Sequence, residues 1–293
     1  MTLDQYITGQ QQFVDQTLDK LVPPATESPE TIHRAMRYSL FAGGKRIRPL
    51  LCMAAAESIS DAPIGVERAA CSLELIHTYS LIHDDLPALD NDDLRRGLPT
   101  CHIKFGDAIA ILAGDALLTL AFEVLSRLDI DAVRKVALIE ELARASGTVG
   151  GMIGGQVHDI EGEGKRPDAK LLESIHRAKT GALLRASVRM GAIYAQADDA
   201  QLAALTSYGE HTGLAFQIVD DILDVEQTSD ELGKTAGKDA AQQKITFPAV
   251  YGIHRSRQMA EEHRLAAHLA LDRFDERAER LRELADLIVR RSA

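Results

Sequence analysis

Apolar residues recur at helical spacing along most of this chain of 293 residues, and this periodicity restricts the fold more than any other feature. Aromatic residues make up only 4% of the sequence, prolines number 9, and no run alternates apolar and polar residues as a half-buried strand would. The sequence therefore predicts an all-α fold and argues against a β-sandwich or a β-barrel. Because no linker, repeat or charge block divides the chain, we expect one domain over residues 1–293.

The expected helices follow one another with short connections. They cover residues 29–41, 49–60, 65–86, 107–128, 131–148, 168–194 and 199–225, and then residues from Phe247 onward, with an amphipathic helix over 260–289. Residues 86–103 and 226–244 are rich in Asp, Gly, Arg and Lys and do not fit a helix. Long irregular segments inside a compact domain are often functional, so we expect the active residues near these two segments.

Charge and cysteine usage limit the classes of partner. The net charge of −11 argues against non-specific binding to nucleic acid or to an anionic membrane. The 3 cysteines form no CxxC pair, which is typical of reduced thiols in the cytoplasm, and the N-terminus does not resemble a signal peptide. The most apolar stretch, residues 108–122, contains Asp115 and is expected to be a buried helix of the core, without membrane insertion.

An Asp-rich cluster follows the apolar helix over 65–86. Its sequence is HDDLPALDNDDLRRG, and its first acidic residues are Asp84, Asp85 and Asp90. Asp carboxylates are hard oxygen ligands that suit Mg²⁺, which completes its coordination with water and substrate phosphates. On an unbroken helix Asp84 and Asp90 would lie roughly 240° apart, so they can converge only if Pro87 distorts the backbone.

A second acidic cluster, QIVDDILD, lies within the helix expected over 199–225. Asp220 and Asp224 share one helix face, one turn apart, and would repel each other unless a cation lay between them. Basic residues accompany both clusters: Lys45, Arg46, Arg48, Arg95, Arg96, Lys179, Lys234, Lys238 and Lys244. This mixture predicts a site for two diphosphates, one bound through metal ions and the other through cationic side chains alone.

The motifs GGKRIRP, DDLPALDNDDLRRG, GGQVHD, AKTG and FQIVDDILD, in this order, resemble those of the trans-prenyltransferases, the short-chain isoprenyl diphosphate synthases. Within that family the chain is most similar to the bacterial farnesyl diphosphate synthases. The resemblance covers about residues 34–250 and implies a bundle of long helices around a central cavity and a homodimer. It also implies Mg²⁺-dependent, head-to-tail addition of isopentenyl diphosphate to dimethylallyl or geranyl diphosphate, giving (2E,6E)-farnesyl diphosphate.

The resemblance also implies roles for individual residues. Three Mg²⁺ ions would be held on the allylic diphosphate by Asp84, Asp85, Asp90, Asp220, Asp221 and Asp224. Cationic contacts to the same diphosphate would come from Arg95, Lys179, Lys234 and Lys244. The site for isopentenyl diphosphate would comprise Lys45, Arg48, His77 and Arg96. Dipoles that stabilise the allylic cation would come from Lys179, Thr180 and Gln217.

Tyr79 and Ser80, which precede Asp84 in the sequence, are expected to set the length of the product. Tyr79 lies five residues before Asp84, roughly 7.5 Å along the helix, and Ser80 lies four before it. A product anchored at the metals would extend along this helix, so a bulky ring would stop its growth. In the farnesyl diphosphate synthases that the chain resembles, an aromatic residue at this position is associated with the C15 limit. His77, seven residues before Asp84, is expected on the same face.

Several alternatives remain open at this stage. The product could be geranyl or geranylgeranyl diphosphate. A class I terpene cyclase would use one Asp-rich motif but would lack the cations for a second diphosphate. An HD-type phosphohydrolase, suggested by His83-Asp84, would need further His ligands and would leave the second acidic cluster unexplained. A catalytically silent dimer partner would be signalled by the loss of one motif, yet both motifs are intact. Arg46 is expected to face solvent or a partner subunit, and Gln156 and Asp159 are expected to support the site without direct chemistry.

Overall fold

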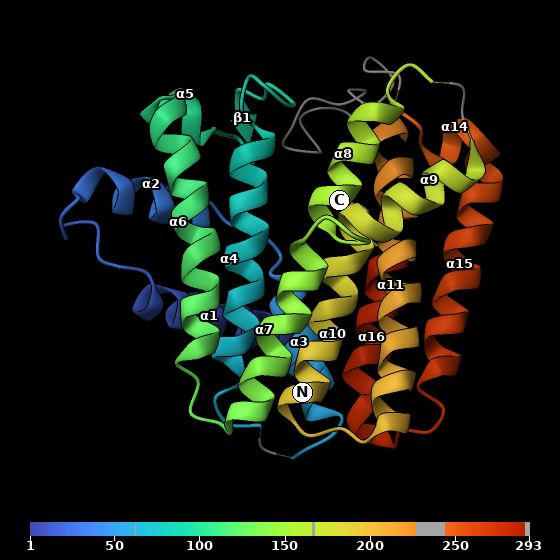
Figure 1. Cartoon of the computed structure of the whole chain (residues 1–293). Coiled ribbons are helices and arrows are strands. Elements are labelled where there is room, and N and C mark those ends of the chain that lie inside the picture. The colour runs from blue at the N-terminus through green and yellow to red at the C-terminus, as the bar shows by residue number, and fades with distance from the viewer. Residues whose placement is uncertain (62, 166–167, 227–243, 291–293) are drawn as a thin grey trace. The chain divides into compact units, whose positions relative to one another are not determined.

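The computed structural model describes residues 1–61, 63–165, 168–226 and 244–290 (Figure 1). The chain divides into two compact units, which are considered one at a time below. The first unit comprises residues 1–50 and 64–139, and the second comprises residues 51–63 and 140–293. Almost all regular structure in the described residues is helical, so the prediction of an all-α fold is confirmed. The expectation of one domain over residues 1–293 stays a prediction.

The first unit is built around two adjacent helices, α4 (Val66–Asp84) and α6 (Asp107–Ser126) (Figure 1). Helix α1 packs on α4, α2 packs on both α4 and α6, and α5 packs on α6. The remaining elements of this unit are α1 (Leu3–Leu21), α2 (Glu30–Leu40), β1 (Leu94–Arg95), β2 (Leu98–Pro99) and α5 (Cys101–Phe105). Two helices, α3 (Ile47–Glu57) and α7 (Ala132–Ser146), begin in this unit and end in the second.

The second unit is arranged around α11 (Asp199–Glu226), which packs against helices that follow and precede it. Its neighbours include α10 (Ala182–Tyr194), α15 (Ile253–Ala270) and α16 (Glu279–Arg290) (Figure 1). The other elements are α8 (Met152–Gly162), α9 (Ala169–His176), the π-helical turn η1 (Arg177–Gly181), α14 (Phe247–Tyr251) and the 3₁₀ turn η2 (Glu276–Ala278). Residues 168–194, expected as one helix, therefore contain a π-helical turn in their middle.

The single helix expected over residues 260–289 is wrong, because α15 ends at Ala270 and α16 begins at Glu279. Arg282 Nη2 donates to the carbonyl oxygens of Leu271 and Phe274, both at 3.1 Å, and so satisfies backbone acceptors in the reversal. The alternation of charged and apolar residues continues through this turn, so periodicity alone did not reveal it.

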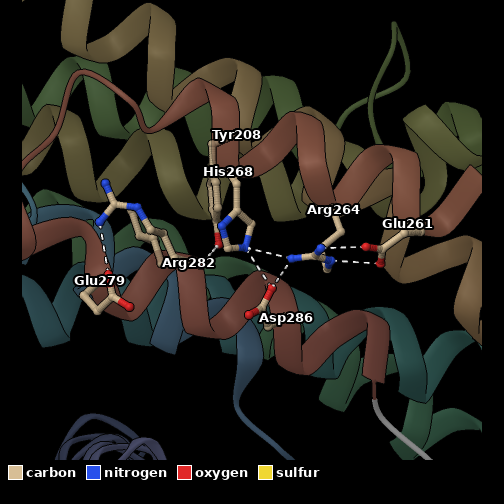
Figure 2. A network of polar contacts seen from close by, with 8 residues as sticks. Tyr208, Glu261, Arg264, His268, Glu279, Arg282 and Asp286 are labelled. Atoms are coloured by element: carbon tan, nitrogen blue, oxygen red, sulfur yellow. Dashed lines mark hydrogen bonds and ion pairs between the residues drawn. The ribbon is translucent and has the colours of Figure 1, made fainter.

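Polar contacts bind α16 to its neighbours in the second unit (Figure 2). The Asp286 carboxylate lies 2.7 Å from Arg264 Nη1 and 2.8 Å from His268 Nε2, both on α15. Burial alone would raise the pKa of Asp286, but the hydrogen bonds from Arg264 and His268 outweigh this effect and lower the pKa. The Tyr208 hydroxyl on α11 donates to the Leu281 carbonyl oxygen at 2.6 Å. The C-terminal helix is therefore attached to two different helices.

Helices α1, α5 and α8 and the pair of short strands were not predicted. The strands occupy two residues each, too few to show an alternating pattern, and pair antiparallel with Arg95 opposite Leu98. Arg96 and Gly97 form the turn between them with φ values of 53° and 75°. Two successive positive φ values are typical of the primed turns that join paired strands.

Arg46 is buried, which corrects the expectation that it faces solvent or a partner subunit. Its Nη1 donates to Glu74 Oε1 at 2.7 Å, and the two side chains are 2% and 3% exposed. Its Nε donates to Asp15 at 2.9 Å, and its Nη2 donates to the Leu40 carbonyl oxygen at 2.7 Å. The guanidinium thus joins α1, α2 and α4, and it is a structural member of the first unit.

All 3 cysteines are free and buried. Among the described residues, α6 is the one helix long and apolar enough to cross a membrane by length and composition, and 39% of its most apolar window is buried. Within its unit this helix packs against α2, α4 and α5. The predicted cytoplasmic location stays a prediction.

The buried ion pair leads to a prediction about stability. Replacing Glu74 by Leu should reduce the free energy of unfolding by about 3 kcal/mol, because the Arg46 guanidinium would stay buried without its main carboxylate partner. The double variant Glu74→Leu/Arg46→Met removes both charges and should recover a large part of the loss. Urea unfolding followed by circular dichroism measures both changes. A single variant as stable as the wild type would show that the pair contributes little.

Candidate functional site

The predicted site residues fall into two groups, one in each unit, and the first group lies where α4 ends. After Asp84 the chain turns back on itself, so that the Asp90 amide donates to the Asp84 carbonyl oxygen at 2.8 Å. The next turn is closed by the Asp92 amide, which donates to the Asp85 carbonyl oxygen at 3.1 Å. Exposed Pro87 lies in this turn. The predicted distortion is therefore present, as a complete end to the helix that brings the backbones of Asp84 and Asp90 together.

Asp85 is buried and paired with Arg95. Its side chain is 4% exposed, and both carboxylate oxygens accept hydrogen bonds from Arg95 at 2.6–2.9 Å. Burial raises the pKa of Asp85, and the hydrogen bonds from Arg95 oppose that rise. The pair attaches strand β1 to the end of α4. The role of Asp85 as a metal ligand stays a prediction, while its observed contacts are those of a residue that orients Arg95.

The side chain of Arg96, from the turn between β1 and β2, packs against the glycine-rich loop that precedes α3. One of its guanidinium nitrogens donates to the Gly43 carbonyl oxygen. A Cβ on Gly44 would lie 2.7 Å from the guanidinium carbon of Arg96, and Gly44 has a φ of +129°. The Arg96 side chain could move aside, but the positive φ strains any residue other than glycine, which explains Gly44 of the GGKRIRP motif. The glycine-rich loop and the turn between β1 and β2 thus bring Arg96 close to cations that lie about 50 residues earlier in the sequence, such as Arg46.

His77 lies within the electrostatic influence of these cations. Burial lowers the pKa of His77 well below its usual range, and the guanidinium groups of Arg48 and Arg96 lower it further. The imidazole is therefore neutral at physiological pH. Lys45 is exposed on the same loop, and its carbonyl oxygen accepts a hydrogen bond from Gln11 at 2.9 Å. The structure thus places Arg48 and Arg96 close enough to His77 for their charges to act on it, and the role of these residues in binding a diphosphate stays a prediction.

Tyr79 is buried on α4, with its ring against the ring of His83 at a centroid distance of 5.7 Å. Its hydroxyl is buried and has no hydrogen-bond partner among the described residues. Burial, followed by the charge of Asp84, raises the pKa of Tyr79 to about 12. Ser80 is half-buried and its hydroxyl donates to the His77 carbonyl oxygen at 2.8 Å, within the same helix.

The second group of site residues lies on α11 of the second unit. Asp220 is half-buried and Asp224 is buried, four residues apart on one face of the helix. Between them, Asp221 is directed into the protein and is only 3% exposed. Its Oδ2 accepts from the Phe247 amide at 2.9 Å, and its Oδ1 accepts from Gln217 Nε2 at 3.0 Å. Asp221 therefore ties α11 to the start of α14.

Lys179 occupies the π-helical turn η1, and its ammonium group donates to Asp159 Oδ2 on α8 at 2.7 Å. Burial alone would raise the pKa of Asp159, but the charge of Lys179 outweighs it and lowers the pKa. A Cβ on Gly155 would lie 2.2 Å from the backbone nitrogen of Lys179, so α8 can approach this turn only through glycine. The GGQVHD segment is therefore the partner of the AKTG segment. π-helical turns are frequent at functional sites.

The remaining predicted residues are placed less fully. Thr180 follows Lys179 in the same turn and is half-buried, and Lys244 is half-buried near Asp159, whose pKa it helps to lower. Lys234 lies outside the described residues. Two predicted diphosphate contacts, Arg95 and Lys179, hold carboxylates in this structure.

His176 is a site residue that the sequence analysis missed. It ends α9 directly before the π-helical turn, and its Nε2 lies 3.4 Å from Asp221 Oδ2. The signal was present in the sequence, because a histidine three residues before Lys179 lies one helical turn from it on the same side. Its contact with Asp221, however, joins residues 45 positions apart in the sequence and needed the fold.

The carboxylates present fit Mg²⁺. Among the residues that the structure describes, no three or more His, Cys, Asp or Glu side chains converge on one point. Magnesium usually takes only one or two carboxylates and completes its octahedral shell with water and substrate phosphates. Each unit supplies such a pair, Asp84 with Asp90 and Asp220 with Asp224. The donors are hard oxygens, and no thiol or imidazole pair competes among them.

Comparison with known proteins identifies the family. The profile of the Polyprenyl synthetase family matches residues 29–288 of this chain. The chain belongs to the polyprenyl synthetase family. It is therefore a prenyltransferase of isoprenoid synthesis, as the motifs predicted.

Individual relatives carry more than one product name. The large subunit 1 of the heterodimeric geranylgeranyl pyrophosphate synthase of Arabidopsis thaliana chloroplasts is 49% identical, over 92% of this chain and 74% of that protein. The farnesyl diphosphate synthase of Geobacillus stearothermophilus is 43% identical, over 99% of this chain and 98% of its own length. The solved structure of an FPP/GFPP synthase from Zymomonas mobilis superposes with a TM-score of 0.87 at 36% identity, covering 98% of each chain.

Proposed function

We propose that this protein is a Mg²⁺-dependent isoprenyl diphosphate synthase that makes (2E,6E)-farnesyl diphosphate. It would join isopentenyl diphosphate head to tail to dimethylallyl or geranyl diphosphate. The observation that carries the proposal is the chemical difference between the groups of side chains. Asp84 with Asp90, and Asp220 with Asp224, offer carboxylates, whereas the residues around His77 offer cations. The two kinds of group suit two diphosphates bound in different ways.

The allylic diphosphate would be bound through the carboxylates. Asp84, Asp90, Asp220 and Asp224 would hold Mg²⁺, in the family's arrangement of three ions, with Arg95 and Lys179 adding positive charge. When bound, magnesium supplies the Lewis acidity that stabilises the departing pyrophosphate. Asp85 and Asp159 would keep Arg95 and Lys179 in position, because each carboxylate already holds its cation in this structure.

Isopentenyl diphosphate would be bound by Lys45, Arg48 and Arg96 without a metal. Guanidinium groups form paired, charge-assisted hydrogen bonds with phosphate oxygens. His77 would donate an N–H without adding charge, because burial and the neighbouring guanidinium groups keep its imidazole neutral. The backbone turn at Gly44 would set the approach of Arg96 to the diphosphate.

The carbon–carbon bond would form when the double bond of isopentenyl diphosphate attacks C1 of the allylic cation. The Lys179 carbonyl oxygen and the Thr180 hydroxyl in the π-helical turn, with the Gln217 side chain, would stabilise that cation as fixed dipoles that do not attack it. The proton lost from C2 would pass to the departed pyrophosphate, so that no side chain is needed as a base.

The acidic pairs can be tested directly. With Mg²⁺, isopentenyl diphosphate and dimethylallyl diphosphate, the wild type should form prenyl diphosphates that chromatography resolves by length, and chelation should abolish turnover. Asp84→Ala and Asp220→Ala should each lower the rate by several orders of magnitude, because each removes one carboxylate of a metal-binding pair. Asp93→Ala, at an exposed position in the loop that follows α4, should keep most activity. Near-normal turnover of both variants would remove the acidic pairs from the mechanism.

The C15 product is supported by Tyr79. Its buried ring lies on α4 before Asp84 and close enough to that carboxylate for the charge to raise its pKa. A chain that grows from a diphosphate held at Asp84 would meet this ring. Geranylgeranyl diphosphate is the alternative product, because relatives named for either product match the chain at similar identity.

Product length should change with the size of the side chain at these positions. Tyr79→Ala should shift the products towards C20 or longer while activity remains, because the variant opens space that a closely packed interior otherwise denies. Ser80→Phe, one residue further along α4, should shorten them towards C10. Radiochromatography of the dephosphorylated products measures both changes. If Tyr79→Ala is folded and active but still releases only C15, another residue limits the chain.

We also propose that two copies of the chain form a homodimer through the exposed apolar surface of α5 and α6. Ile103 on α5 is 52% exposed, and Ile111 and Leu112 on α6 are 44% and 53% exposed. An apolar helix with large exposed aliphatic residues is a common site of association between identical chains.

The dimer can be tested by light scattering coupled to size-exclusion chromatography. The wild type should have twice the mass of one chain. Leu112→Glu should shift the protein towards the monomer, because it places a charge within an apolar contact. Leu269→Glu is the matched control, since Leu269 is 69% exposed on α15 in the other unit. A monomeric wild type, or dissociation by both variants alike, would contradict this interface.

A further inference from the structure

We propose that His176 is a positioning residue of the second acidic motif: it holds Asp221 and thereby fixes the segment of α11 that carries Asp220 and Asp224. The proposal rests on the proposed function, since it assigns the role of a residue outside the motifs that predicted that function. His176 would touch neither substrate, and it would act through the Asp221 carboxylate.

The ring of His176 is enclosed and oriented by its surroundings. The residue is 7% exposed, and its ring stacks on the ring of Phe247 with a centroid distance of 5.2 Å and an angle of 24° between the planes. Its Nε2 atom is buried and has no hydrogen-bond partner among the described residues. This atom lies 3.4 Å from Asp221 Oδ2. A buried ring nitrogen without a hydrogen-bond partner costs free energy, unless another conformation of the protein supplies the partner.

Asp221 needs such a partner. Its two hydrogen bonds come from neutral groups, the Phe247 amide and the Gln217 side chain. A buried carboxylate without a cationic partner is expensive, and an imidazole N–H directed at it would add a third donor. In the first unit, Asp85 is likewise the second aspartate of its Asp-Asp pair, and its carboxylate accepts hydrogen bonds from the Arg95 guanidinium. Among the described residues, His176 is placed to serve Asp221 in the same way.

The position of His176 in the chain also connects Asp221 to the π-helical turn that carries Lys179. It ends α9, and the next residues form the π-helical turn with Lys179 and Thr180. Asp221 lies between Asp220 and Asp224 on one helical segment. The contact between the ring and the carboxylate therefore joins the turn to the acidic face of α11. The distance of 3.4 Å is just beyond the usual hydrogen-bond range of about 2.7–3.2 Å, so a shift of a few tenths of an ångström closes it. We infer that it closes when Mg²⁺ and pyrophosphate bind.

The test compares two replacements of His176 with the wild type. Gln at this position keeps an N–H donor close to the place of Nε2, whereas Leu keeps bulk without a donor. Isothermal titration calorimetry with Mg²⁺ and inorganic pyrophosphate measures binding without turnover. His176→Leu should weaken this binding about tenfold, the factor that corresponds to one charge-assisted hydrogen bond, while His176→Gln should stay within about threefold of the wild type. His263→Asn, a half-buried histidine on α15 of the same unit, is the control and should bind as the wild type does.

Kinetic measurements separate positioning from simple packing. His176→Leu should raise the KM for the allylic diphosphate and the Mg²⁺ concentration for half-maximal activity, and it should leave the KM for isopentenyl diphosphate unchanged. A loss of stability alone would lower active enzyme without this selectivity. Equal weakening by His176→Leu and His176→Gln would overturn the proposal, because packing and not the donor would then matter. Unchanged binding and KM in a folded His176→Leu variant would overturn it as well.

A measurement on the wild type guards against a variant that fails to fold. In protein labelled with ¹⁵N-histidine, the Nε2–H signal of His176 should become slowly exchanging and shift downfield when Mg²⁺ and pyrophosphate are added. No change in that signal would overturn the proposal. The proposed function fails separately: a wild type that binds Mg²⁺ and pyrophosphate through His176 but transfers no prenyl group would refute the reaction and leave the positioning role standing.

Discussion

The second carboxylate of each Asp-Asp pair is buried and bonded to the protein, and the arrangement of both groups of site residues depends on this. Asp85 and Asp221 are each 3% exposed, while Asp84 and Asp220 beside them are half-buried. Consecutive residues on a helix point about 100° apart, so one member of each pair can face inward while the other faces the site. The inward carboxylate fixes the backbone from which the outward one projects. One aspartate of each adjacent pair therefore attaches its helix to the protein, while the other is left half-buried.

The partners of the inward carboxylates differ in charge. Asp85 is held by the guanidinium of Arg95, which pairs with both oxygens. Asp221 is held by an amide of the backbone and by a side-chain amide, with the imidazole of His176 just beyond hydrogen-bond distance. The first acidic motif is thus locked by an ion pair, and the second retains a contact that can still tighten. This difference underlies the proposed tightening of the contact between His176 and Asp221 when a diphosphate binds.

Two glycines lie directly against residues that supply predicted site cations. The guanidinium of Arg96 lies where a Cβ of residue 44 would be, and the backbone of Lys179 lies where a Cβ of residue 155 would be. In both places a glycine of a recognised motif admits the partner of another motif. The motifs are therefore pairs of surfaces that fit together as well as sets of reactive side chains. This accounts for glycines in GGKRIRP and GGQVHD that would otherwise have no chemical role.

The sequence by itself determined the helical class, the family and the two acidic pairs, because these depend on local spacing and on motifs that are contiguous in the chain. Periodicity located α2, α4, α6 and α11 to within a few residues. It missed the break between α15 and α16, since the charge pattern continues through the turn. Only the tertiary structure decided which aspartate of each pair faces inward, that Arg46 is buried on Glu74, and that His176 meets Asp221. The last two of these contacts join residues at least 28 positions apart, and such pairing is set by how helices pack rather than by any local pattern.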